Sequence, residues 1–304
     1  MSENTKTVFI AIVGCPNVGK STILNRILGT KVAIVSEKPQ TTRTRIMGVL
    51  TEGDTQLVFT DTPGYHKPRN KLGEKMIEAI GEGISGVDAC LFVVEPTMGI
   101  RPEEVELIER LKKEDIPTIL AINKIDTVKD KDELIPRIAE LNEAYKFEAI
   151  VPISAKHNDG LKQLLGEMKK LAFDSPFFFP EDTLTDQPER VIAAEIIREK
   201  LLRNLDREVP HGTAVGIELF RERDDGSGIL DIEATIYCEK ESHKSIIIGK
   251  GGNMLKIIST RARQDMEKFF DCHINLHCWV KVKEDWRNKE GLIKNFGLDS
   301  TSGE

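Results

Sequence analysis

The chain has 304 residues, of which 39% are hydrophobic and 31% charged, and its formal net charge is −7. That length is sufficient for two domains that each bury a core, and the composition excludes the disordered and collagen-like classes. No apolar run approaches the roughly 20 residues of a membrane-spanning helix. The first residues, Met-Ser-Glu-Asn-Thr-Lys, lack the pattern of a secretory signal, and five cysteines without Cys-x-x-Cys spacing fit reduced thiols, so we expect a cytoplasmic location.

The charge is distributed unevenly along the chain. Residues 240–294 contain twelve lysines and arginines against seven acidic residues, an excess of +5, so the rest of the chain carries −12. A basic segment attached to an acidic body predicts a polyanionic partner that binds only that segment.

From residue 8 to about residue 172, apolar runs alternate with amphipathic stretches. The runs predict strands at 8–13, 46–50, 56–59, 89–94, 118–122 and 149–153, and the stretches predict helices at 21–28, 72–84, 103–113, 132–144 and 161–171. This alternation indicates an α/β domain with a mostly parallel sheet and helices on both faces. Ligand-binding loops are then expected at the carboxyl ends of the strands.

The segment between the first strand and the first helix has the sequence GCPNVGKS, at residues 14–21. This spacing is typical of a phosphate-binding loop, in which backbone N–H groups surround a phosphate, the lysine reaches the β and γ phosphates and the serine hydroxyl ligates Mg²⁺. An ordinary glycine turn is the alternative, but the strand before and the helix after disfavour it. The predicted nucleotide contacts are Gly14, Asn17, Val18, Gly19, Lys20, Ser21 and Thr22.

Two further segments follow later strands. Asp61-Thr-Pro-Gly64 comes after the third, where Asp61 would hold Mg²⁺ through water and the Gly64 N–H would bond a γ-phosphate. Asn-Lys-Ile-Asp at 123–126 comes after the fifth, where Asp126 would accept from guanine N1–H and its exocyclic amine. Adenine has neither donor at those positions, so the pattern predicts selectivity for guanine nucleotides.

After the sixth strand comes Ser154-Ala155-Lys156, whose backbone N–H groups would meet the guanine O6. Each of these segments is common when taken by itself. Their order, and their placement on loops at one edge of a parallel sheet, make the combination specific.

The motif set resembles the translation-factor-related class of P-loop GTPases. The resemblance implies that GTP and GDP are substrate and product, that Mg²⁺ is the cofactor, and that Lys20, Thr42 and Gly64 act in catalysis. It assigns Thr42, in the segment KPQTTR at 38–43, as the switch threonine because that residue directly precedes Arg43. The implied metal ligands are Ser21, Thr42 and Asp61, and the implied guanine contacts are Asn123, Lys124, Asp126, Ser154, Ala155 and Lys156.

Two residues of the motif loops distinguish this chain from Ras-like members. Tyr65 occupies the position after the second-switch glycine, where Ras-like proteins have a water-orienting glutamine, so slow intrinsic hydrolysis is expected. Asn17 occupies the position at which some relatives hold K⁺ against the phosphates, which predicts stimulation by K⁺ over Na⁺. The alternative for Asn17 is a loop residue that bonds its own backbone.

Residues 174–190 read as a linker between a nucleotide domain at 1–173 and a second domain at 191–304. The linker contains three consecutive phenylalanines, Phe177 to Phe179, between prolines. So many aromatic side chains are unfavourable in a free linker, and we expect them to dock on a domain. A peripheral membrane contact at the inner face of the cell membrane is the alternative.

The remaining pattern is a helix at 191–205, strands at 214–220 and 229–237, a second helix, the turn Gly249-Lys-Gly-Gly252, a third helix and a strand at 272–282. This order resembles an α+β KH domain of the type II order. The resemblance implies single-stranded RNA binding by Ile248, Gly249, Lys250, Gly251, Gly252 and Leu255. A plain helix-helix turn is the alternative reading of the glycine motif.

The segment at 272–278, CHINLHC, contains four residue types that ligate zinc. Read with the period of a strand, Cys272 and Cys278 share the face of the apolar residues, whereas His273 and His277 point to the other face. The pattern therefore favours a strand with an apolar inner face over a zinc site.

The pairing of a GTPase domain with a type II KH domain, together with KPQTTR at 38–43 and WVKVKE at 279–284, resembles the Era family of GTPases along essentially the whole chain. The resemblance implies a monomeric GTP-driven switch that binds the 3′ end of small-subunit ribosomal RNA and acts on the pre-ribosomal small subunit. Two other classes stay open: a GTPase with a different client, and a constitutive RNA-binding protein in which GTP is structural.

Overall fold

The computed structural model describes residues 5–65, 67–68, 70–97 and 99–298. The chain divides into two compact units. The first comprises residues 1–33, 42–68 and 74–186, and the second comprises residues 34–41, 69–73 and 187–304. Each unit has its own cluster of buried apolar side chains, as expected for separate folding cores.

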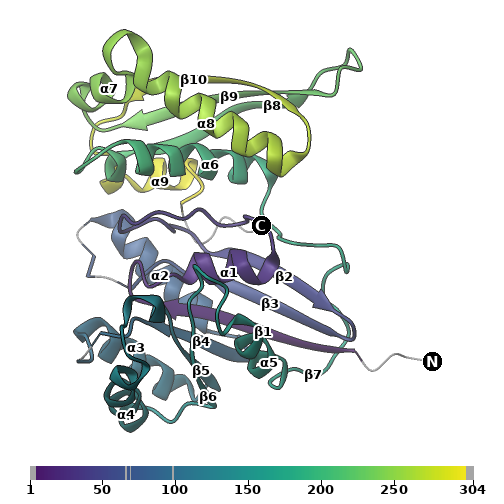
Figure 1. Ribbon diagram of the computed structural model, residues 1–304. Helices are drawn as coiled ribbons and strands as arrows, with labels where there is room; N and C mark the ends of the chain where they lie inside the picture. The colour runs from purple at the N-terminus through teal and green to yellow at the C-terminus, as the bar shows by residue number, and fades with distance from the viewer. Residues whose placement is uncertain (1–4, 66, 69, 98, 299–304) are drawn as a thin grey trace. The chain divides into compact units, whose positions relative to one another are not determined.

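The first unit is a sheet covered by helices (Figure 1). Its strands are β1 (Lys6–Gly14), β2 (Ile46–Glu52), β3 (Thr55–Asp61), β4 (Ala89–Val94), β5 (Thr118–Ile122), β6 (Ala149–Pro152) and the short β7 (Phe173–Asp174). Its helices are α1 (Lys20–Leu28), α2 (Lys71–Ile84), α3 (Pro102–Glu114), α4 (Leu134–Ala144) and α5 (Leu161–Lys169). The predicted strands and helices of this region are all present; the strands at 89–94 and 118–122 have the predicted bounds, and other boundaries shift by up to a few residues.

The sheet order is β2-β3-β1-β4-β5-β6, with β7 pairing β1. The strands β3, β1, β4, β5 and β6 are parallel to one another, whereas β2 runs antiparallel to β3 and β7 antiparallel to β1. Because β1 and β4 lie in the middle and are covered on both faces, they are apolar along almost their whole length. The predicted α/β fold with a mostly parallel sheet is confirmed.

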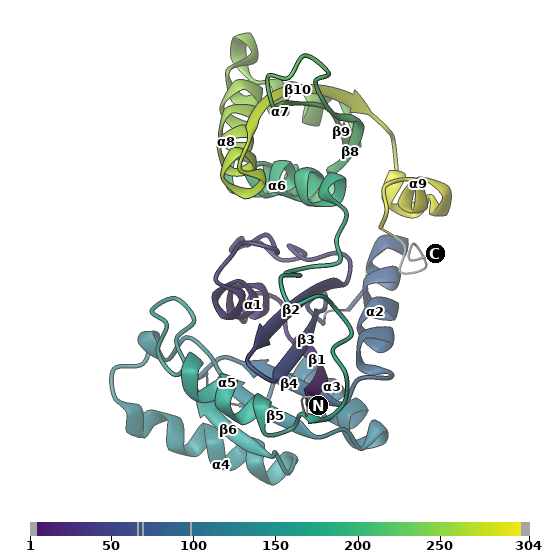
Figure 2. The same ribbon diagram turned by 90° about the vertical axis from the view of Figure 1, so that its right-hand side faces the viewer.

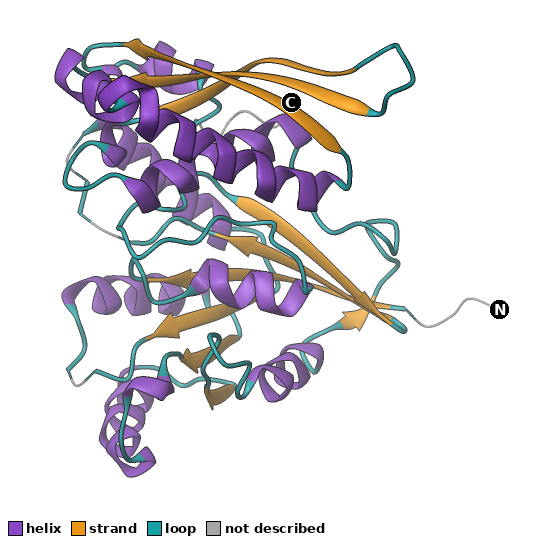
Figure 3. Ribbon diagram, turned by 45° about the horizontal axis from the view of Figure 1, so that its top comes forward, coloured by secondary structure: helices purple, strands orange, loops and turns teal. Residues whose placement is uncertain are grey.

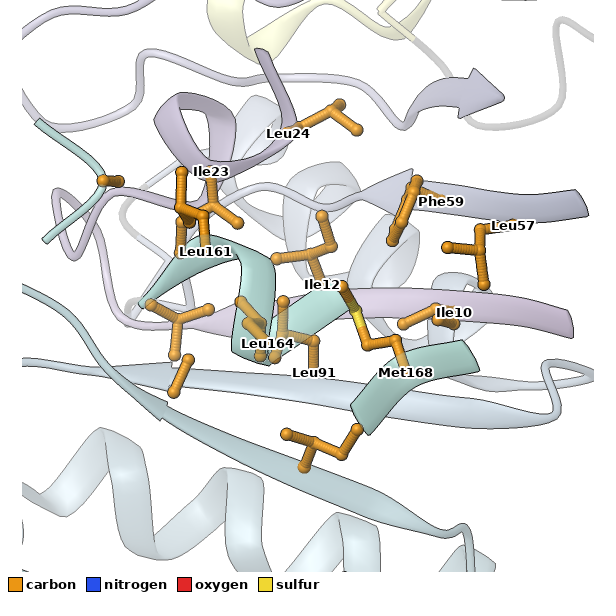
Figure 4. Close-up of a cluster of buried hydrophobic side chains, with 14 of the residues drawn as sticks. Ile10, Ile12, Ile23, Leu24, Leu57, Phe59, Leu91, Leu161, Leu164 and Met168 are labelled. Carbon is orange, nitrogen blue, oxygen red and sulfur yellow. The ribbon is translucent and has the colours of Figure 1, made fainter. Parts of the chain in front are cut away.

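The two faces of this sheet bury separate clusters. On one face, α1 and α5 pack against strand residues such as Ile12 and Leu91, and Figure 4 shows Leu164 and Met168 of α5 beside them. On the other face, helices α3 and α4 contribute Leu107 and other apolar residues to a cluster with the alternate strand residues. Alternation along each strand therefore sends successive side chains to opposite cores.

The linker runs along the first unit. The side-chain amide of Gln56, which is fully buried, accepts from the Phe178 and Phe179 N–H groups at 2.9 and 3.1 Å and donates to the Phe179 oxygen at 2.9 Å. The Phe178 ring lies edge-on to Phe9 with centroids 5.0 Å apart, yet the residue remains 59% exposed. The prediction that this segment docks is confirmed for its backbone, while Phe178 is only partly covered.

The second unit is a three-stranded sheet with helices along one side, visible in Figures 2 and 3. Its strands are β8 (Ala214–Glu222), β9 (Ile229–Cys238) and β10 (His273–Val282), and its helices are α6 (Glu189–Asn204), α7 (Glu241–Ile248), α8 (Asn253–Phe270) and α9 (Glu290–Asn295). The sheet order is β10-β9-β8, with β10 parallel and β8 antiparallel to β9. The predicted order of elements is therefore present.

The core of the second unit lies between the sheet and helices α6 and α8. Ile197 of α6, Ile258 of α8 and Ile236 of β9 are among its fully buried residues. At the C-terminal side, Trp286 is fully buried and its Nε1–H donates to the Gly212 oxygen at 2.9 Å. No helix of the part that the structure describes is long and apolar enough to cross a membrane.

Candidate nucleotide and RNA sites

The phosphate loop joins β1 to α1, and α1 begins at Lys20. No side chain caps the first turn of this helix and no acidic residue occurs in it, so its N-terminal N–H groups are suited to an anion. Lys20 is buried, and its Nζ donates to the Gly14 and Cys15 oxygens at 3.1 and 3.0 Å. Burial lowers the pKa of Lys20, with Asp61 opposing that shift. The structure thus places the Lys20 ammonium group inside the loop. A bound phosphate would replace the Gly14 and Cys15 oxygens as its hydrogen-bond acceptor.

Three oxygen-bearing side chains converge beside this loop. The Ser21 hydroxyl donates to Asp61 Oδ2 at 2.6 Å and lies 3.0 Å from Thr42 Oγ1. Asp61 is completely buried at the end of β3, and its Oδ1 has no hydrogen-bond partner among the described residues. Burial raises the pKa of Asp61 to about 6, while Lys20 and the two hydroxyls oppose the shift. An orphaned buried carboxylate oxygen beside two hydroxyls fits the oxygen ligands that Mg²⁺ requires.

The two adjacent threonines of the 38–43 segment have different surroundings. Thr42 is buried beside Ser21, whereas the Thr41 hydroxyl donates to the Lys38 oxygen at 2.6 Å. The geometry therefore brings the predicted residue, Thr42, into the candidate metal site.

The segment after β3 is packed against the phosphate loop. A Cβ at Gly64 would lie 2.6 Å from Pro16 Cα, so only glycine permits this approach. The next residue, Tyr65, donates its backbone N–H to the Gly14 oxygen at 3.1 Å. Its hydroxyl bonds Glu106 of α3, and the Arg110 guanidinium lies 5.2 Å from the ring centroid. Tyr65 therefore packs against α3, where its hydroxyl is bonded to Glu106, and its side chain has no amide group to orient a water.

The loop after β5 carries the candidate guanine reader. Asp126 Oδ1 accepts from the Ser154 hydroxyl at 2.6 Å, and that bond lowers the pKa of Asp126, which therefore stays ionised at neutral pH. An ionised carboxylate held in this way accepts two donors, as guanine recognition requires. The structure brings Asp126 and Ser154 together from loops after two different strands.

Asn123 ties the guanine-reading loops to the phosphate loop. Its Nδ2 donates to the Val18 oxygen at 2.8 Å, and its Oδ1 accepts from the Ala155 N–H at 3.0 Å. The Ser154 N–H donates to the Asp159 oxygen at 3.0 Å. Two of the three N–H groups expected to meet guanine O6 therefore have other partners here, and the remaining one belongs to Lys156.

The sequence reasoning missed Glu95, which follows β4 directly. Glu95 Oε1 pairs with Lys124 Nζ at 2.5 Å and its Oε2 with Arg101 at 2.6 Å. It therefore orients the lysine of the guanine-reading loop. In the sequence, Glu95 could have been found from its position at the carboxyl end of the strand at 89–94, because ligand-binding loops are expected at strand ends.

The glycine turn of the second unit lies between α7 and α8. Gly249 has a φ of 72°, and a Cβ there would lie 2.7 Å from Met254 Cβ, so the turn requires glycine. A Cβ at Gly251 or Gly252 would meet nothing within 4 Å among the described residues, so this backbone is open to a ligand. Lys250, between Gly249 and Gly251, is exposed, whereas Ile248 and Leu255 are half-buried against the core.

The strand β10 alternates as predicted. Ile274 and Val280 are buried in the core cluster, and His273 and His277 are exposed. The cysteines and histidines of this segment therefore lie on opposite faces. No cluster of three or more His, Cys, Asp or Glu residues suited to a metal ion occurs within the described ranges.

Comparison with known families defines the class of protein first. A family described as 50S ribosome-binding GTPase matches residues 9–124, and the KH domain family matches residues 208–287. The chain is therefore a P-loop GTPase with a KH domain, the class to which the phosphate loop and the glycine turn point.

Relatives that match along nearly the whole chain identify the family within this class of GTPases. The GTPase Era of Ruminiclostridium cellulolyticum is 51% identical over 96% of this chain and 97% of its own length, and that of Clostridioides difficile is 49% identical over 97% and 99%. This chain belongs to the Era family of GTPases.

Two solved structures match with a TM-score of 0.94 at 39% identity, each over 97% of this chain. One is an Aquifex aeolicus Era variant bound to GDP·AlF4⁻, of which the match covers 100%. The other is Era in complex with MgGDPNP and nucleotides 1506–1542 of 16S ribosomal RNA, of which it covers 99%. The two-part architecture of the chain is thus that of the Era family.

Proposed function

We propose that this chain is a GTP-hydrolysing switch that binds the 3′ end of small-subunit ribosomal RNA through its KH domain and acts in small-subunit assembly. The observation that supports this most strongly is the full-length match to Era bound to a GTP analogue and to a segment of 16S ribosomal RNA. One matching family is described by its binding to the 50S subunit. That match covers only residues 9–124, so we favour the small subunit for the complete chain.

In this proposal residues 1–173 form the GTPase domain, 174–190 the linker and 191–304 the KH-type domain. The nucleotide contacts are the phosphate-loop residues and Thr22, with guanine read by Asp126 and the loops at 123–126 and 154–156. For the chain to act as a switch, RNA must bind the GTP and GDP states with different affinity, and RNA must then shift nucleotide affinity by the same factor.

The metal site of this proposal consists of Ser21, Thr42 and Asp61. Mg²⁺ held there would supply positive charge beside the β and γ phosphates. The chain's own groups complete the site: Lys20 reaches the phosphates from inside the loop, and the Gly64 N–H marks the presence of a γ-phosphate. Because Tyr65 is held beneath α3, nothing at that position orients a water, and intrinsic turnover is expected to be slow.

Asn17 is the proposed contact for K⁺. It has a φ of 65° within the phosphate loop. We expect GTP hydrolysis to be faster in K⁺ than in Na⁺ at equal ionic strength, and Asn17→Ala to abolish the difference. Equal rates in the two salts for the native chain would remove the K⁺ proposal.

The RNA site of this proposal is the turn Gly249-Lys-Gly-Gly252, bordered by Ile248 and Leu255. The open backbone at Gly251 and Gly252 allows RNA phosphates to approach, and exposed Lys250 supplies a positive charge.

The experiment is ultraviolet crosslinking in cells followed by sequencing of the bound RNA. We expect reads at the 3′ end of 16S ribosomal RNA for the native chain and their loss in a Lys250→Asp, Gly251→Asp variant. A matched control is Gly291→Asp, Lys294→Asp, which makes the same two changes on α9, where a Cβ at Gly291 meets nothing within 4 Å among the described residues. Scattered reads, or reads on the large-subunit RNA that survive the first variant, would contradict the proposal.

We further propose that the chain works as a cytoplasmic monomer. A membrane surface is the second candidate binding partner. Phe173 and Phe178 are 50% and 59% exposed and would provide the apolar surface for a peripheral membrane contact. Flotation with anionic lipid vesicles tests this: co-flotation that Phe178→Ala abolishes would support membrane contact, and absence of co-flotation would exclude it. Sedimentation equilibrium tests the monomer.

A further inference from the structure

The sheet of the second unit has an outer face that carries aromatic and basic side chains. On β10 the side chains alternate, so that Ile274 and Val280 enter the core while His277, Trp279 and Lys281 point to the other face. β10 is also one of the two edge strands of the sheet, the other being β8 (Figure 2). These residues therefore line both a sheet face and a sheet edge.

Two of these side chains form a stack. The rings of His277 and Trp279 have centroids 6.1 Å apart and an interplanar angle of 30°. The Trp279 residue is 45% exposed to solvent, whereas Trp286 is completely buried. Farther along the face the aromatic surface is covered, because Phe296 packs on Tyr237 with centroids 4.7 Å apart. An exposed indole beside an imidazole leaves a flat π surface available to a ligand.

The charge around this stack favours an anionic ligand. The segment from His273 to Lys283 contains two lysines and no carboxylate. The neighbouring Asp231 on β9 is neutralised, since Arg223 binds it at 2.9 Å and the Asn275 amide at 2.8 Å. Glu233, opposite His277 in the register, places one carboxylate beside the stack, against the two lysines of this segment.

We propose that His277 and Trp279 form a stacking platform for a base of single-stranded RNA that flanks the nucleotides held at the glycine turn. This inference rests on the proposed function, since it assumes RNA at that turn. A KH clamp holds about four nucleotides, so a longer RNA must continue over neighbouring surface. The helix α8 begins at the turn and packs against the inner face of β10, so the edge strand is a short route from the clamp to the outer face.

The occupant is RNA rather than an apolar protein surface because of the side chains that surround the indole. Aromatic residues interleaved with lysines are the arrangement by which proteins bind single strands without reading their sequence, since each base presents a π face and each linkage a phosphate. A wholly apolar partner would have to desolvate Lys281 and Lys283 without pairing their charges.

The test uses the two tryptophans of the chain as reporters. RNA of about ten nucleotides with the 3′-terminal sequence of 16S ribosomal RNA is titrated into the full chain, with the tetranucleotide that fills the clamp as comparison. We expect the longer RNA to quench the Trp279 fluorescence and the tetranucleotide to leave it unchanged. In Trp279→Phe the quenching disappears while affinity for the longer RNA is kept, because a phenyl ring also stacks.

Trp279→Ala is expected to weaken binding of the longer RNA by about 5- to 100-fold and to leave tetranucleotide affinity unchanged. The fluorescence of Trp286, then the remaining tryptophan, reports that the variant is folded. Leu219→Ala is the matched control, because Leu219 is an exposed apolar residue on β8, two strands away in the same sheet.

Native affinity of Trp279→Ala for the longer RNA, combined with loss of binding in Lys250→Asp, Gly251→Asp, would overturn the platform and leave the proposed function intact. Native affinity in both variants would overturn both.

Discussion

Asn123 binds Val18: the side-chain Nδ2 donates to the backbone oxygen of the phosphate loop at 2.8 Å, across 105 positions of the chain. The other end of the same amide accepts from Ala155 N–H at 3.0 Å. One buried side chain therefore joins three loops that follow different strands. The phosphate-binding and guanine-reading parts of the site are held in register by this residue, which need not touch the nucleotide to do so.

Asn123→Ala should weaken binding of both GTP and GDP. It removes two buried hydrogen bonds and leaves the Val18 oxygen and the Ala155 N–H without a partner, at a cost of about 1–3 kcal/mol for each unsatisfied group. We expect a loss of about 10- to 100-fold in affinity by isothermal titration. Asn142→Ala, at an exposed position of α4, serves as control, and equal affinities for the two variants would contradict the bridging role.

Asp126→Asn should change the base that the site accepts. An asparagine presents one donor and one acceptor, which match the C2 carbonyl and N1–H of xanthine, whereas guanine offers two donors. We expect GTP affinity to fall by about 100-fold or more and xanthosine triphosphate to bind instead. Competition between the two nucleotides measures the switch, and retained preference for GTP would show that another group reads the base.

The ionisation of Asp61 should have opposite effects on two quantities as pH rises. The free energy of unfolding of the nucleotide-free chain should fall, and the affinity for Mg²⁺ should increase. Burial raises its pKa from 3.8 to about 6, so between these values the folded state holds a proton that the unfolded state has lost. The stabilisation from that proton is complete below pH 3.8 and is lost as pH rises through 6. Metal binding requires the carboxylate, so Mg²⁺ affinity should instead rise as pH increases through 6.

Asp61→Asn separates these effects. The nucleotide-free variant should be at least as stable as the native chain at pH 7 and lose this part of the pH dependence, while Mg²⁺-dependent GTP hydrolysis is abolished. Denaturant unfolding at pH 5 and pH 7, without nucleotide, measures the first effect, and a GTPase assay measures the second. A destabilised variant at pH 7 would show that the ionised carboxylate contributes to folding.

Tyr65→Phe should leave GTP hydrolysis unchanged, because the tyrosine hydroxyl bonds Glu106 rather than a group of the nucleotide site. Loss of that bond should lower the free energy of unfolding by about 1 kcal/mol. Single-turnover GTPase rates and denaturant unfolding of the two proteins provide the comparison. A lower rate for Tyr65→Phe would place the hydroxyl in the reaction.

Arg137→Ala should destabilise the first unit strongly. Arg137 and Glu104 are 0% and 1% exposed and bond at 2.8 Å between α4 and α3, so the variant leaves a buried carboxylate without its partner. Removing one member of such a pair costs about 3–5 kcal/mol. Glu109→Gln, which breaks the exposed pair with Lys112 on α3, is the control and should change stability by less than about 1 kcal/mol.

The local sequence of this chain predicted most of its elements. The strand at 118–122 has the predicted bounds, and the first helix begins one residue before its predicted start. These segments were predictable because a short continuous apolar run is typical of a strand buried on both faces, and apolar residues with a period of 3.6 are typical of a helix with one buried face. Alternation along residues 272–282 likewise separated an apolar face from a polar face, so the outward histidines of β10 were predicted correctly.

What the sequence by itself determined is therefore the order of elements, the motifs at strand ends and the family, since each depends on residues near one another in the chain. Only the tertiary structure decided which distant side chains meet: Asn123 with Val18, Glu95 with Lys124, and Tyr65 with Glu106. The physical reason is that these bonds depend on the sheet order, which brings loops from separate strands to one edge. No local pattern records that order, because a side chain's partner across a sheet is selected by packing and not by its neighbours in sequence.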